Sequence, residues 1–163
     1  MKNSITQTRT NVFKCSRGAA AIEFVFLFII FFAFFYAIAT YSLIFMLQTS
    51  FHHAANEGAR SAISVDPQAF VSETAYIDSG VIPVVRTTVG NALSWLPVKA
   101  RNQVLGMSNG NVDVTVVNKV LTVRVIYQNY VSNPLIPLIN LPGIGPIFST
   151  PTDLQGRAVL KLT

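Results

Sequence analysis

One acidic side chain stands at the edge of a long apolar run, and it is the residue of this sequence best placed to do chemistry. Glu23 follows the segment 17–22, read R-G-A-A-A-I, and precedes Phe24. A carboxylate at the centre of a membrane helix costs roughly 2.5 to 3.5 kcal/mol, and less near an interface, so an acid here indicates a function. A cut after Gly18 would give Ala19 a positively charged amine. That amine could pair with the Glu23 carboxylate, within one chain or between neighbouring copies. In the simpler alternative, Glu23 only extends to the lipid headgroups.

Other patterns that carry chemistry are weak in this sequence. His52 and His53 are adjacent, so on a helix they point about 100° apart, and no cysteine or acid cluster at suitable spacing adds metal ligands. Gly143 and Gly145 lie in L-P-G-I-G-P, which lacks the lysine and the following helix of a phosphate-binding loop. There is no G-x-S-x-G or H-E-x-x-H motif and no paired carboxylates. We therefore expect no enzyme, no metal and no cofactor.

The element that must position Glu23 is an apolar helix. From Phe24 to Leu47 the sequence has no charged residue, and at 1.5 Å per residue this run is about 36 Å long, enough for the roughly 30 Å hydrocarbon core. The whole chain is 51% hydrophobic and only 12% charged, which favours a membrane protein. Ten aromatic residues lie in the run and can also pack against neighbouring helices: Phe24, Phe26, Phe28, Phe31, Phe32, Phe34, Phe35, Tyr36, Tyr41 and Phe45.

The net charge of +5 comes almost entirely from the residues before Ala19. Residues 1–18 hold four basic residues and no acid, whereas eight basic and seven acidic residues follow Gly18. By the positive-inside rule the N-terminus is cytoplasmic and the C-terminal part lies outside the cytoplasm. No basic patch remains for nucleic acid. The only cysteine, Cys15, has no apolar region before it, which argues against a lipid attachment. The four basic residues are Lys2, Arg9, Lys14 and Arg17.

Three stretches resemble the TadE-like minor pseudopilins of tight-adherence (Flp-type) pilus systems. They are R-G-A-A-A-I-E-F at 17–24, A-A-N-E-G-A-R-S-A at 54–62 and Q-G-R-A-V-L-K at 155–161. In type IV pilin-like proteins the first pattern marks a prepilin-peptidase site, so the resemblance implies cleavage between Gly18 and Ala19, with Glu23 and Phe24 serving recognition and assembly. The major Flp pilins are much shorter and have tyrosine where Phe24 stands, which favours a minor component.

Two other readings stay open. The chain could be an unprocessed, single-pass anchored binding module that keeps its leader. Alternatively, the A-x-A triplet at 37–39 could be cut by signal peptidase after Ala39, giving a secreted protein that begins at Thr40. The apolar pattern continues to Leu47, and an ordinary signal sequence has no acid at its start, so this cut is the weaker alternative.

In the part of the chain that we expect to be exported, the sequence predicts helices followed by strands. One long helix should extend out of the membrane, with one face of mostly small residues. Glu57 and Arg60 should form an ion pair on its solvent-exposed face. Asp66 and Pro67 should begin a second helix that ends near Gly80. A further helix, whose valines and leucines recur at spacings of three and four residues, should end at Pro97. The expected inner face of the long helix is Phe51, Ala54, Ala55, Gly58, Ala59 and Ala62, with His52, His53 and Asn56 outside; the further helix has Val85, Val89, Leu93 and Leu96.

After Gly110 the spacing of the apolar residues changes from the helical period to a period of two residues. Alternating residues predict strands over 112–116 and 121–127, joined by a hairpin turn at Asn118 and Lys119. Residues 132–151 hold five of the eight prolines and predict an extended loop. A last strand over 154–162 should close a small antiparallel sheet against the long helix.

Together these patterns predict an α+β protein of the pilin type. We expect a leader at 1–18, a transmembrane helix at 19–47, and a periplasmic domain at 48–163 with short helices and a three-stranded antiparallel sheet. The resemblance implies a minor pseudopilin of the inner membrane that supports pilus biogenesis, surface adhesion and biofilm formation. The expected partners are a prepilin peptidase, other pilins and pseudopilins, the inner-membrane pilus platform and the lipid bilayer, but not nucleic acid.

Overall fold

A computed structural model describes residues 16–137, 139–141, 145–146 and 150–162 of the chain. The chain forms two compact units, residues 1–39 and residues 40–163. Residues 1–15 of the expected leader, including Cys15, lie outside the described residues, and so does Gly143 of the L-P-G-I-G-P segment.

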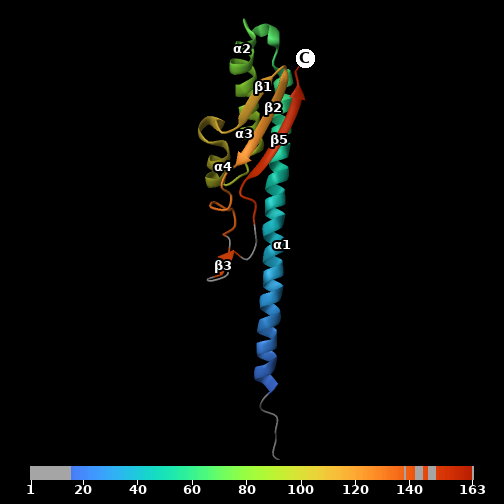
Figure 1. The fold of residues 1–163 in the computed structure, drawn as a ribbon, viewed down its shortest axis with the longest axis vertical. Coiled ribbons are helices and arrows are strands. Elements are labelled where there is room, and N and C mark those ends of the chain that lie inside the picture. Colours follow the sequence, from blue (N-terminus) through green and yellow to red (C-terminus); the bar gives the residue numbers. More distant parts are fainter. Residues whose placement is uncertain (1–15, 138, 142–144, 147–149, 163) are drawn as a thin grey trace, which may run out of the picture. The chain divides into compact units, whose positions relative to one another are not determined.

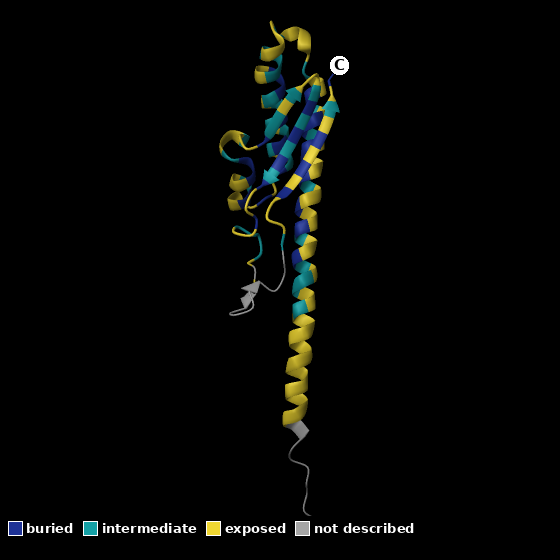
Figure 2. Ribbon diagram, viewed as in Figure 1, coloured by how far each residue is buried: buried dark blue, intermediate teal, exposed yellow. Residues whose placement is uncertain are grey.

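The longest element is helix α1, Ser16–Ser61, which begins in the first unit and ends in the second (Figure 1). Residues 18–32 are exposed on every side of the helix, whereas from Thr40 onward one face is buried (Figure 2). This buried stripe recurs at the helical period, as the sequence predicts. The small-residue face is confirmed, because these six residues are all buried: Phe51, Ala54, Ala55, Gly58, Ala59 and Ala62.

The chain after α1 departs from the predicted second helix. Asp66 caps a helix start as predicted, since its carboxylate accepts a hydrogen bond from the Gln68 N–H at 2.9 Å. However, that helix is only the 3-10 turn Pro67–Ala69, and a new helical run begins beyond it. This run comprises α2 (Glu73–Ala75), the π-helix Tyr76–Val81 and α3 (Ile82–Ala92).

Gly80 therefore lies inside a helical run, and the prediction that a helix ends there is wrong. A Cβ on Gly80 would lie 2.7 Å from Cζ of the Phe70 ring. The absence of a side chain at Gly80 leaves room for the aromatic ring from the preceding loop. This tertiary contact, and not a helix end, explains the glycine at this position.

The helical pattern of α3 is confirmed, but the sequence did not predict the helix that follows it. Val85 and Val89 are buried in α3, and a turn carries the buried Leu93 and Leu96 before Pro97. Pro97 then stands at the N-cap of α4 (Val98–Leu105), since a proline that ends one helix can precede the next. A 3-10 turn, Met107–Asn109, leads to the sheet.

The sheet is antiparallel with three strands in the order β1-β2-β5. Strands β1 (Asp113–Val117) and β2 (Val120–Tyr127) form the predicted hairpin. Asn118 and Lys119 at the turn have φ values of 51° and 62°, the conformation that a two-residue hairpin turn requires. Strand β5 (Leu154–Lys161) pairs with β2 along its whole length, and the predicted α+β fold with three antiparallel strands is confirmed.

Within residues 132–151, the described parts include one short ladder. Strand β3 (Asn140–Leu141) pairs antiparallel with β4 (Gly145–Pro146). Residues 138, 142–144 and 147–149 of the expected loop lie outside the described residues.

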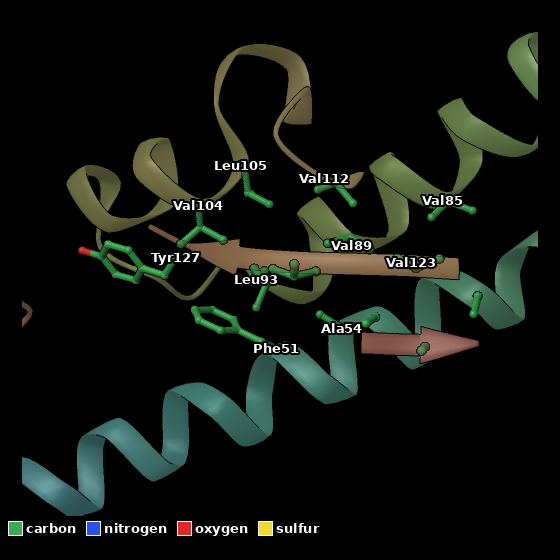
Figure 3. Close-up of a cluster of buried hydrophobic side chains, with 14 of the residues drawn as sticks. Phe51, Ala54, Val85, Val89, Leu93, Val104, Leu105, Val112, Val123 and Tyr127 are labelled. Carbon is green, nitrogen blue, oxygen red and sulfur yellow. The ribbon is translucent and has the colours of Figure 1, made fainter. Parts of the chain in front are cut away.

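The core of the second unit lies between one face of the sheet and helices α1, α3 and α4 (Figure 3). Two close approaches bring the layers together. A Cβ on Gly58 would lie 2.7 Å from Cγ2 of Val89, so α1 lies directly against α3. On the other side, Gly156 of β5 contacts the backbone of Phe51 and His52 in α1. The predicted contact of the last strand with the long helix is thus present.

Candidate functional site

The expected cleavage site lies in the first turn of α1. The helix begins at Ser16, so the bond between Gly18 and Ala19 is two to three residues from its end. Gly18 and Ala19 are exposed, and a Cβ on Gly18 would meet no atom within 4 Å. Glycine weakens a helix by about 1 kcal/mol relative to alanine, so the bond after Gly18 lies in an exposed stretch of α1 that the glycine makes less stable.

Glu23 lies on the same side of the helix as Ala19. The two residues are four apart, which places them one above the other at a rise of about 6 Å. Glu23 is exposed, and among the described residues it has no hydrogen-bond or ion-pair partner. Within the part of the chain that the structure describes, this carboxylate is thus open to solvent or to a partner.

Phe24 begins a ladder of stacked aromatic rings along α1. Its ring centroid lies 6.2 Å from that of Phe28, with 26° between the planes. The rings of Phe28 and Phe32 follow at 6.1 Å and 22°. Phe24 is 68% exposed, and Phe28 and Phe32 are exposed as well, so the ladder offers an apolar surface. Sequence reasoning named these aromatics but missed the ladder, although its signal, the spacing of four residues, is visible in the sequence.

The helix that carries this site is long and apolar enough to cross a membrane. Its candidate span, Gly18–Ser64, has a mean hydropathy of 2.6 in its most apolar window, and none of that window is buried. An unburied helix of this composition is unfavourable in water, because each exposed apolar side chain loses the stabilisation of burial. The helix is thus compatible with single-pass membrane anchoring.

The C-terminal part of α1 is fixed within the second unit. Phe51 is fully buried, and the glycine contacts with α3 and β5 hold the helix from two sides. Glu57 and Arg60 pair on the exposed side at 3.8 Å, as predicted. Whatever acts on the first turn of α1 therefore acts on an element that is also part of the core of the second unit.

The two histidines lie outside the core. His52 and His53 are exposed, and Nδ1 of His52 accepts a hydrogen bond from the Arg157 N–H of β5 at 3.4 Å. In the part of the chain that the structure describes, no group of three or more histidine, cysteine, aspartate or glutamate residues could hold a metal ion. The His52 contact joins α1 to the sheet.

Residues 18–60 match the family model of TadE-like proteins. The matched segment begins at Gly18, includes Glu23 and Phe24, and ends within the run at 54–62. The match confirms the resemblance for this part of the chain and supports involvement in a tight-adherence pilus system. The searches of curated proteins and of solved structures found no match.

Proposed function

We propose that this chain is a minor pseudopilin, a structural assembly subunit of a tight-adherence pilus. Residues 1–18 are a leader that a prepilin peptidase removes, residues 19–47 cross the inner membrane, and residues 48–163 lie in the periplasm. Through the pilus, the protein supports surface adhesion and biofilm formation.

The observation that carries this proposal is an exposed site at the start of α1. Gly18, Ala19, Glu23 and Phe24 lie together there and are all exposed, and among the described residues the Glu23 carboxylate has no hydrogen-bond or ion-pair partner. A carboxylate at the edge of an apolar helix carries a cost, so it is retained where something outside the chain uses it.

Cleavage would turn this site into a pair of opposite charges. The new amine of Ala19 and the carboxylate of Glu23 lie one helical turn apart. Two unit charges 4 Å apart attract by about 1 kcal/mol in water and by about 4 kcal/mol at an effective dielectric constant of 20. In an assembly, the carboxylate of one subunit can meet the amine of the next, and the ladder from Phe24 to Phe32 can pack against neighbouring helices.

The first test is the N-terminus of the mature protein. The full chain is expressed with the prepilin peptidase of its own system, recovered from membranes and analysed by intact mass spectrometry. We expect a chain that starts at Ala19, and an intact leader in a matched strain with an inactive peptidase. An intact leader in the presence of active peptidase contradicts the proposal and favours the unprocessed anchor, while a chain that starts at Thr40 favours the secreted protein.

The second test replaces the carboxylate. Glu23→Ala should abolish or strongly reduce pilus formation and surface attachment, while the protein stays in the membrane, because removing the acid makes insertion easier. Glu57→Ala is the matched control, since Glu57 lies on the same helix beyond the apolar run and pairs only at the surface with Arg60. If Glu23→Ala cells make normal pili, Glu23 has no role in assembly.

A further inference from the structure

The second unit has a groove between α1 and the end of α3, which we call the α1–Trp95 groove. It has a volume of about 480 Å³. One side is a single face of α1, because its members recur at the helical spacing of three and four residues; the other side is formed by Ala92 and Trp95. The α1 residues of the groove are Ser42, Phe45, Met46, Thr49, Ser50 and His53.

The groove combines exposed apolar side chains with a rigid support. Phe45 is 72% exposed, Met46 48% and Trp95 46%. Trp95 stands in the turn after α3, between Leu93 and Leu96, which are both buried. The turn is closed by a hydrogen bond from the Leu96 N–H to the Leu93 carbonyl at 3.1 Å. The core thus holds the turn in a position that keeps the indole ring at the surface.

The polarity of the groove changes along α1. After the hydroxyl of Ser42, the aromatic and thioether side chains of Phe45 and Met46 follow, the hydroxyls of Thr49 and Ser50 come one turn later, and His53 stands at the far end. Such a gradient fits the border between hydrocarbon and water, where aromatic residues with a polar atom are enriched. The indole ring can lie at the acyl chains while its N–H bonds a headgroup oxygen.

The position of the groove along α1 agrees with that border. If the hydrocarbon core begins at Phe24, about twenty residues cross it, so its far edge lies near Leu43. Phe45 and Met46, about 3 and 4.5 Å beyond Leu43, then fall in the headgroup layer, which is about 5 to 7 Å thick on each side, and Thr49 follows at its water side. The α1 residues of the groove therefore follow directly, along the sequence, on the residues that would cross the hydrocarbon core.

We propose that the α1–Trp95 groove is a membrane-interface site, in which phospholipid headgroups and upper acyl chains lie against Phe45 and Met46 with Trp95 as an interfacial anchor. The site fixes the height of the second unit at the outer surface of the bilayer. This inference rests on the proposed anchoring by α1 but not on cleavage or pilus assembly.

Trp95 is the only tryptophan of the chain, so its fluorescence reports on the groove alone. The full chain is reconstituted into phosphatidylcholine vesicles whose acyl chains carry bromine either close to the headgroup or near the chain end. We expect a blue shift on reconstitution, strong quenching by the shallow bromines and weaker quenching by the deep ones, because bromine quenches indole only at contact.

A matched control moves the tryptophan to a distant part of the same unit. The double variant W95F/V71W places it at a residue that is fully exposed, in the loop before α2. We expect this variant to show no quenching by either brominated lipid and strong quenching by iodide in solution, whereas Trp95 in the native chain is protected from iodide.

The outcomes separate this inference from the anchoring on which it rests. Flotation of the same vesicles after an alkaline carbonate wash reports anchoring. If the protein floats with the vesicles but the shallow bromines do not quench Trp95, the groove does not contact lipid and the inference is wrong. Protection from iodide without quenching by bromine would show a protein occupant and would also overturn it. If the chain does not float, both the anchoring and this site fail.

Discussion

Gly156 offers a direct test of how closely strand β5 lies against helix α1. Its φ is not in the left-handed region, so the glycine is there for space and not for backbone freedom. A Cβ at this position would overlap the carbonyl carbon of Phe51 and the amide nitrogen of His52. Both contacts are backbone atoms of a helix, and β5 is held by its pairing with β2, so neither side can yield by a change of rotamer.

The expected cost of Gly156→Ala follows from this overlap. Overpacking a rigid contact costs typically 1–3 kcal/mol, and the loss of unfolded-state entropy returns about 0.4–1 kcal/mol. A net loss of about 1–2 kcal/mol lowers the Tm of a domain of this size by about 5–10 °C. Gly18→Ala is the control, because no atom lies within 4 Å of the added Cβ. Thermal unfolding of both full-length variants in detergent is followed by the fluorescence of Trp95. A Gly156→Ala protein that melts with the native one would refute the close approach.

Two further predictions concern the sheet. Lys119→Gly should raise the free energy of unfolding by up to about 1 kcal/mol, because Lys119 has a φ of 62° that glycine adopts without strain; Asn118→Gly, at 51°, should gain less, and urea unfolding compares the two. Burial, and then the neighbouring Tyr130, raise the pKa of Tyr127 above its ordinary value of 10.0. The folded state thus holds this proton more tightly than the unfolded chain. The contribution of Tyr127 to the free energy of unfolding is therefore present below pH 10 and is lost as the pH rises above it. Tyr127→Phe removes the hydrogen bond from its hydroxyl to the Asn133 carbonyl at 2.6 Å, which should cost about 0.5–1.5 kcal/mol at neutral pH. In urea unfolding it should also flatten the dependence of the free energy of unfolding on pH above about pH 10, and an unchanged slope would contradict this role of burial.

Local patterns predicted the elements whose residues repeat with a clear period. The helical spacing of Phe51, Ala54 and Ala55 identified the buried face of α1, because a helix in contact with a core must place its apolar residues on one side. The alternation in β1 and β2, with Asn118 and Lys119 between them, identified the hairpin for a similar reason. The segment from Gly18 to Phe24 was also identified from the sequence, because the charge of Glu23 and the apolar run that follows it can both be read there directly.

Contacts between distant segments could not be predicted in this way. Gly80 looks like a helix end until the Phe70 ring is seen beside it, and Gly156 looks like an ordinary strand residue until α1 lies against it. Helix α4 was missed because Pro97 marks a stop for the preceding helix and gives no sign of the next. Each of these positions is decided by what packs there from elsewhere in the chain.

The sequence by itself thus determined the apolar helix of membrane-spanning length, the basic residues before it and the carboxylate at its edge, because an uncharged run of this length and the order of residues around Glu23 need no tertiary partner. Only the tertiary structure decided the strand order β1-β2-β5, the approach of β5 to α1, and the groove that holds Trp95 beside Phe45 and Met46. These features depend on residues about thirty to a hundred positions apart, and the packing of the folded core is what brings such residues together.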